Sequence, residues 1–169
     1  MSISMHSQSV PVFVRMLNNL SGILDKTAQS CAERKIEPAV LLGSRLSPDM
    51  FPLSRQVQIA CDMAKGGAAR LGGVEVPKYE DNEVTIDDLK ARIAKTVAFV
   101  KSVPEAQFGD SDTRNVTIQM RGEPVTMAGQ KYLNNSVLPN FFFHLTTTYA
   151  ILRHNGVPLG KVDFTGGAG

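Results

Sequence analysis

The chain is poor in the residues from which many active sites are built. It has no tryptophan, two cysteines and three histidines (His6, His144 and His154), and no two of the histidines are spaced as HxxxH. A catalytic zinc site normally needs three protein ligands. Neither a GxSxG nucleophile motif nor a phosphate-binding loop ending in Lys-Ser/Thr is present. The sequence therefore argues against a histidine-only zinc site, a serine hydrolase and a nucleotide-binding loop.

Long apolar runs and an excess of one charge are absent as well. No stretch approaches the roughly 20 apolar residues of a membrane span. The first ten residues, MSISMHSQSV, lack the basic and apolar regions of a signal peptide. The 18 basic residues are interspersed with 16 acidic ones, without the basic run typical of polyanion binders. We therefore expect a cytoplasmic protein that binds neither membranes nor nucleic acid.

The sequence does contain a repeated helical period. Apolar residues recur every three or four positions in four segments, which we expect to be helices: 10–34, 52–71, 85–103 and 139–154. The length fits one domain spanning residues 1–169. Four amphipathic helices predict a mainly all-α fold, a four-helix bundle in which sites are built from facing side chains. Cys31 and Cys61 fall on apolar helix faces, which predicts buried thiols rather than a disulfide.

Before the last helix the period changes from helix to strand. Apolar and polar residues alternate on both sides of a turn at residues 121–124, which predicts a β-hairpin over 116–127. An isolated hairpin is marginal in water, so its apolar face must pack on the helices. A short helix is expected over 128–138. We expect a loop over 36–50 and a loose tail over 157–169.

Polar residues on otherwise apolar helices suggest one candidate site. His144 lies in the middle of the last helix, with Asn140 and Thr148 four residues away on the same face. Gln58 and Asp62 are likewise four residues apart on the second helix. An uncompensated polar group in a core costs on the order of 1–3 kcal/mol. We therefore predict that the two rows either pair with each other or line a pocket, and a contact between Asp62 and His144 is a specific hypothesis.

Several of these residues have more than one interpretation. His144 is either a hydrogen-bonded core residue or part of a pocket. His154 fits a role at the negative end of its helix, and His6 fits a flexible or loosely packed residue. Phenylalanines 141–143 suit the core or a helix or subunit contact, and alternatively a ligand. Charged residues of the hairpin are either solvated or rim the pocket: Arg114, Arg121 and Glu123.

Three blocks of the sequence resemble a known superfamily. They are LSPDMFPLSRQVQIACDMAKGGAARLGG, TRNVTIQMRGEPVTM and YLNNSVLPNFFFHLTTTYAILRHNGVPLGK, and they cover nearly the whole chain. They are similar to an uncharacterised bacterial and fungal family of unknown function, grouped with the DinB/YfiT-like helical bundles. The resemblance implies a four-helix bundle, often a homodimer. Many members of the superfamily carry a divalent metal on three histidines, and some are thiol-dependent transferases.

The resemblance also assigns positions to the candidate site. It places His144 at the final histidine of the superfamily and Asn140 at the other ligand position of the last helix. Gln58 takes the place of the remaining histidine, with Asp62 one turn further on. One of three expected ligands is therefore retained, so no metal or other cofactor is expected; if a divalent metal binds at all, its ligands would be His144, Asp62 and Gln58.

Three functions follow as hypotheses. In the first, the protein binds a small molecule in a pocket around His144, lined by Gln58, Asp62, Asn140 and Thr148. In the second, it is a metal- or thiol-dependent transferase with an altered ligand set. In the third, it is a structural or interaction module without a ligand. A homodimer is expected in each case, and the sequence leaves the existence of an enzymatic activity open.

Overall fold

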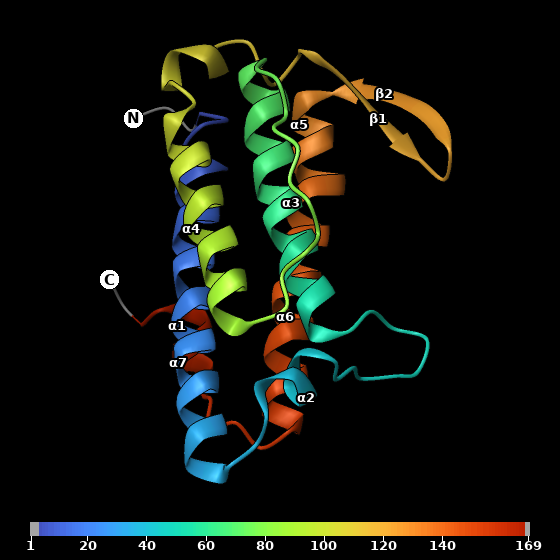
Figure 1. Cartoon of the computed structure of the whole chain (residues 1–169). Coiled ribbons are helices and arrows are strands. Elements are labelled where there is room, and N and C mark those ends of the chain that lie inside the picture. The colour runs from blue at the N-terminus through green and yellow to red at the C-terminus, as the bar shows by residue number, and fades with distance from the viewer. Residues whose placement is uncertain (1–3, 168–169) are drawn as a thin grey trace.

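The computed structural model describes residues 4–167 and is built mainly of helices (Figure 1). Its four longest helices are α1 (Val10–Arg34), α3 (Leu53–Gly72), α4 (Ile86–Ser102) and α6 (Leu138–His154). They agree closely with the four predicted segments. The prediction of a mainly helical bundle with an inserted hairpin is therefore confirmed. No described helix is both long and apolar enough to cross a membrane.

The direction of the helices explains how the chain is connected. Helices α1 and α6 run one way along the bundle, and α3 and α4 run the other way (Figure 1). Helix α1 packs against α4, while α3 packs against both α4 and α6. Because α3 and α4 are consecutive and parallel, the chain must return along the bundle between them. Residues 74–85, which we call the crossover segment, make this return beside α3 without forming a helix or strand (Figure 1).

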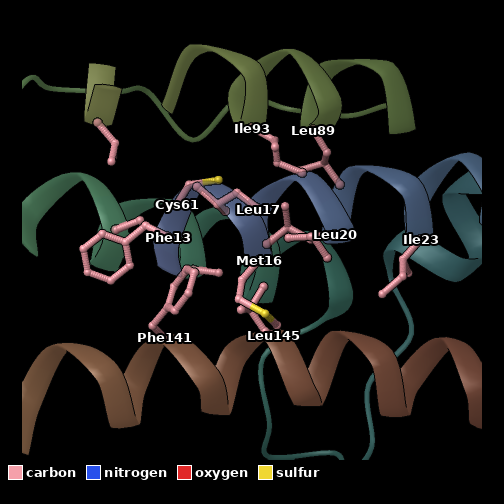
Figure 2. Close-up of a cluster of buried hydrophobic side chains, with 14 of the residues drawn as sticks. Phe13, Met16, Leu17, Leu20, Ile23, Cys61, Leu89, Ile93, Phe141 and Leu145 are labelled. Atoms are coloured by element: carbon pink, nitrogen blue, oxygen red, sulfur yellow. The ribbon is translucent and has the colours of Figure 1, made fainter. Parts of the chain in front are cut away.

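The interior is filled by apolar side chains from all four long helices (Figure 2). Phe13 of α1 and Phe141 of α6 are both fully buried, and their rings meet edge to face with centroids 5.2 Å apart. Cys31 and Cys61 are buried free thiols, as predicted. The core therefore lies along the whole bundle rather than at one end of it.

Small residues on α3 allow its neighbours to approach closely, as its sequence indicates. Ala60, Ala64 and Ala68 are fully buried. Gly67 has no room for a side chain, because a Cβ atom there would lie 2.8 Å from Val137 Cγ1. The path of the chain before α6 is thus fixed closely against α3.

The hairpin consists of β1 (Asn115–Met120) and β2 (Glu123–Ala128), paired antiparallel with Ile118 opposite Val125. Arg121 and Gly122 form the turn with φ angles of 53° and 87°. Two consecutive positive φ angles are typical of the tight turns that match the twist of paired strands. The hairpin projects from one end of the bundle (Figure 1), and Val116 at its base is buried.

One predicted loop contains a short helix instead. The loop expected over 36–50 includes the short helix α2 (Pro38–Leu42), and η1 (Glu105–Phe108) is a short 3-10 turn after α4. The predicted helix over 128–138 is α5 (Gly129–Tyr132) followed by a π-turn, η2 (Leu133–Val137).

The structure corrects the prediction that the C-terminal tail is loose. Residues expected to be loose form helix α7 (Lys161–Thr165), which packs on α1. Asn19 Nδ2 donates to the carbonyl of Phe164 at 3.0 Å, and Lys26 Nζ lies 2.6 Å from Asp163 Oδ1. These bonds join residues more than 130 positions apart, so no local pattern could reveal them.

Candidate functional site

His144 lies on the face of α6 that packs against α3. Only 8% of the residue is exposed. Its ring nitrogen Nδ1 is 2.6 Å from Oε1 of Gln56, a residue in the first turn of α3. The amide nitrogen of Gln56 donates to the main-chain carbonyl of Phe51 at 3.0 Å. A chain of two hydrogen bonds therefore links the imidazole to the loop before α3.

These two hydrogen bonds determine which ring nitrogen of the neutral imidazole carries the proton. The carbonyl of Phe51 can only accept, so the Gln56 amide must present its nitrogen there and its oxygen to His144. The proton of the neutral imidazole consequently sits on Nδ1, and Nε2 keeps its lone pair. Burial, helped by the positive charge of Arg55, lowers the pKa of His144 below its ordinary value of 6.5. The ring is thus neutral at physiological pH.

The second ring nitrogen, Nε2, forms no hydrogen bond within the described residues, 4–167. The atom is nevertheless not completely buried, unlike the other unpartnered atoms Ser30 Oγ and Arg92 Nε. Nε2 therefore belongs to the small exposed part of the side chain. The ring of Phe143 packs edge-on against the imidazole, with centroids 5.2 Å apart.

The other predicted residues of α6 have local roles. Thr148 is fully buried, and its hydroxyl donates to the carbonyl of His144 at 2.9 Å. Asn140 is exposed, and its amide donates to the carbonyl of Ser136 at 2.6 Å. Each side chain thus bonds to the main chain four residues before it, within α6 for Thr148 and in η2 for Asn140. Neither makes a hydrogen bond to the His144 side chain.

The predicted pairing of Asp62 with His144 is wrong, because Asp62 points toward α4. Its Oδ1 atom lies 2.9 Å from Lys65 Nζ and 3.0 Å from Arg92 Nη2. Gln58 also faces away from α6, since its amide donates to Glu83 in the crossover segment at 2.8 Å. At 3.6 residues per turn, positions 58 and 62 lie on a different side of α3 from position 56. The spacing of polar residues in the sequence could not show whether Gln56 or Gln58 faces His144.

A metal held by His144, Asp62 and Gln58 does not fit this geometry. The two oxygen-bearing side chains bond to α4 and the crossover segment, whereas the imidazole bonds to Gln56. Among residues 4–167, no group of three His, Cys, Asp or Glu side chains is placed to hold a metal. We therefore derive no chemistry from a metal at these positions.

Arg92 of α4 organises a second polar cluster, which the sequence analysis missed. It is only 4% exposed, and its guanidinium lies 2.9–3.0 Å from four oxygen atoms. It donates hydrogen bonds to the main-chain carbonyl of Glu80 and to the carboxylates of Asp62 and Glu83, and it forms an ion pair with Asp81. One arginine therefore ties the crossover segment to both α3 and α4. Its place in the apolar stripe, three residues after Leu89, was the signal that it is buried.

Tyr79 of the crossover segment lies among the cations of this cluster. Lys65 Nζ and Lys95 Nζ are 3.9 and 4.2 Å from its ring centroid, within the range of cation–π contacts. Burial raises the pKa of the Tyr79 hydroxyl. Burial likewise raises the pKa of the nearby Cys61 thiol to about 12, so this sulfur is an unreactive thiol rather than a nucleophile.

A cleft of about 660 Å³ opens between the crossover segment and α4. Eight of its lining residues are polar or aromatic: Lys78, Tyr79, Glu80, Asn82, Glu83, Asp88, Arg92 and Lys95. Size alone makes it large enough for a small organic molecule. It lies on the Arg92 side of α3, whereas His144 is on the α6 side.

The charged residues of the hairpin have mainly structural positions. Arg114 Nη1 donates to the carbonyl of Leu71 at 2.6 Å and so joins the base of the hairpin to the end of α3. Arg121 and Glu123 are exposed at the turn.

The other two histidines lie away from His144. The His6 ring packs edge-on against Phe108, with 5.2 Å between the ring centroids. His154 is exposed at the last position of α6.

Comparison with known proteins gives a family and a fold. A family model described as a domain of unknown function, DUF1993, matches residues 5–165. The crystal structure of a DinB family member protein from Shewanella denitrificans is 41% identical, with a TM-score of 0.91. The match covers 96% of this chain and 92% of that one. No curated protein matches. The resemblance noted in the sequence is therefore confirmed.

Proposed function

The chain belongs to the DUF1993 family, with the fold of a DinB family member, and we propose that it binds a small molecule at His144. The observation that supports this most directly is the fixed imidazole. Gln56 accepts a hydrogen bond from Nδ1, while Nε2 keeps a lone pair, has no hydrogen-bond partner within residues 4–167 and is not completely buried. A histidine that served only the core would be expected to have both nitrogens bonded, since buried polar atoms are nearly always satisfied.

The environment indicates what kind of group would bind. A neutral imidazole with an open Nε2 accepts a hydrogen bond, so the ligand must present an O–H or N–H group. The ring of Phe143 lies edge-on beside the imidazole and is 54% exposed, which favours an aromatic or other apolar body next to that group. Phenol and indole combine both features and are suitable probes.

The test uses ¹⁵N-labelled protein and the ring signals of His144. Adding phenol or indole is expected to shift the Nε2 resonance, because a new hydrogen bond forms at that atom. The matched control is His154→Ala, which removes an exposed histidine from the same helix and should leave the shift unchanged. In His144→Ala, stabilisation of the protein by either probe should disappear. A free protein whose proton sits on Nε2 would contradict the proposal.

The proposal also includes a homodimer and a cytoplasmic location. A shallow groove of about 390 Å³ on α6 is lined mainly by apolar atoms, from Leu46, Phe142, Phe143, Thr146, Thr147 and Ala150. Leu46 and Phe143 are 44% and 54% exposed, which is costly for a surface in contact with water. A second copy of the chain seated on this groove would cover Leu46 and the part of Phe143 that a bound ligand leaves exposed. Two free buried thiols fit a reducing compartment.

A further inference from the structure

Helix α6 has an outer face without charge over most of its length. From Leu138 to Leu152 the helix contains no Asp, Glu, Lys or Arg, and the first such residue is Arg153. A helix at the surface of a soluble protein usually carries charged residues opposite its apolar face. The exposed positions of this stretch are instead Pro139, Asn140, Phe143 and Thr146. This face is therefore better suited to contact with another surface than to contact with water.

The shallow groove on this face and the imidazole share one side chain. The ring of Phe143 lines the groove and also packs edge-on against His144. The loop before α3 contributes Leu46 to the groove. The same loop carries Phe51, which is 56% exposed and whose carbonyl accepts from Gln56, the hydrogen-bond partner of the imidazole. The loop and the helix that flank the imidazole therefore both expose apolar side chains.

One chain gives a ligand at His144 little cover. Small-molecule sites usually bury more than about 70% of the surface of their ligand. Here the groove is shallow, and Phe143 beside the imidazole is more than half exposed. A ligand that bonds to Nε2 and packs on this ring therefore keeps its outer side open toward the groove.

A second copy of the chain is the occupant that the lack of charge favours. In a two-fold dimer the same surface meets itself, so charges of one sign on that surface would face each other. A face without charge avoids this repulsion, and contact between the two grooves removes their apolar atoms from water. Building on the proposed function, we propose that the partner chain completes the His144 site. The ligand then lies between the imidazole of one chain and the groove of the other.

Ligand binding and dimerisation must in that case strengthen each other. The coupling is reciprocal, so dimerisation raises the affinity for the ligand by the same factor by which the ligand raises the affinity between the chains. Competition for the Phe143 ring would have the opposite sign, because a ligand that covers the ring would displace the partner. The sign of the coupling therefore distinguishes a shared site from two competing ones.

Sedimentation of the full chain with and without indole measures this coupling. We expect indole to lower the dimer dissociation constant of the wild type at least about fivefold. In His144→Ala, indole should no longer affect the association of the chains.

A charge in the groove tests the same coupling from the other direction. Thr146→Lys changes an exposed residue of the groove three positions after Phe143. This variant is expected to be monomeric and to bind indole at least about fivefold more weakly, as followed by the Nε2 resonance of His144. Val162→Lys is the matched control, since it adds the same charge at an exposed residue of α7 outside the groove. Circular dichroism confirms that each variant is folded.

The results separate this inference from binding at His144 itself. If monomeric Thr146→Lys binds indole as tightly as the wild type, the His144 site stands and its completion by the partner is wrong. Dissociation of the dimer by indole also overturns the inference, because ligand and partner would then compete. So does a dimeric Thr146→Lys, or a wild type that is monomeric with and without indole. If indole does not shift the Nε2 resonance in any form of the protein, binding at His144 is refuted as well.

Discussion

His144 and Arg92 are both buried, yet their partners give them different charges. The imidazole meets an uncharged amide oxygen, and it stays neutral because burial and the positive charge of Arg55 lower its pKa. The guanidinium meets three carboxylates and a carbonyl, and these oxygens compensate the cost of burying its charge. The same bundle therefore holds one neutral acceptor on the α6 side of α3 and one fixed cation on the α4 side.

The neutral state of His144 predicts how stability depends on pH. Its pKa in the folded protein is below the ordinary value of 6.5. Well above pH 6.5 the imidazole is neutral in both the folded and the unfolded state, and its contribution to stability is complete. As the pH falls below 6.5, the unfolded chain takes up the proton first, so stability is lost until the folded pKa is passed.

We therefore expect the free energy of unfolding to decrease between about pH 7.5 and 5.5 by more in the wild type than in His144→Gln. Urea denaturation at several pH values measures this difference. His154→Gln is the control, because it changes an exposed histidine of the same helix. Equal pH dependence in the wild type and His144→Gln would show that the imidazole is not held neutral by the fold.

At the level of elements, α3 is the helix with close neighbours on several sides. It contacts α4, α6 and the turn η2, and its small residues allow this. Helix α1, in contrast, has Gly22, where a Cβ atom would have nothing within 4 Å. Gly67 and Gly22 therefore have different reasons to be glycine, although both lie inside helices.

A pair of substitutions separates the two cases. Gly67→Ala is expected to destabilise the protein by about 1–3 kcal/mol, because the new methyl would clash with Val137 and Phe13. Gly22→Ala is expected to stabilise it by up to about 1 kcal/mol, since alanine is the better helix former. Chemical denaturation measures both values. Similar effects of the two changes would mean that α3 and η2 are not packed as closely as the structure shows.

At the level of the whole molecule, the exposed apolar groove on α6 bears on assembly. We expect the wild type to sediment as a particle of two chains, each of 18.3 kDa. Phe143→Glu places a charge in the groove and should give monomers. Val162→Glu makes the same change at an exposed apolar residue of α7 and should leave the dimer intact. A wild-type monomer at micromolar concentration would refute the homodimer.

The sequence predicted the elements well where the signal is local. The helical period located α1, α3, α4 and α6, and Thr85 caps α4 in a capping box with Asp88. The hairpin was predicted from alternation around a turn, and its register follows from the positive φ angles of Arg121 and Gly122. Helix α7 was missed because its stability comes from α1, far away in the sequence.

The candidate site was predicted only in part. His144 is buried in the bundle beside a polar residue of α3, but that residue is Gln56 and not Asp62. Both faces of α3 carry polar side chains among small ones, so their spacing fits either neighbour. Arg92 was overlooked because a single arginine in an amphipathic helix is usually solvated, and its three carboxylate partners come from two other segments.

The sequence by itself determined the class of fold, the positions of the long helices and the buried histidine, because these depend on patterns within a few neighbouring residues. Only the tertiary structure decided which side of α3 faces α6 and which faces the crossover segment. That choice is a rotation of the helix about its own axis, fixed by close contacts such as Gly67 with Val137. It separates Gln56 from Gln58 and Asp62, and so places the imidazole and the guanidinium in two different sites.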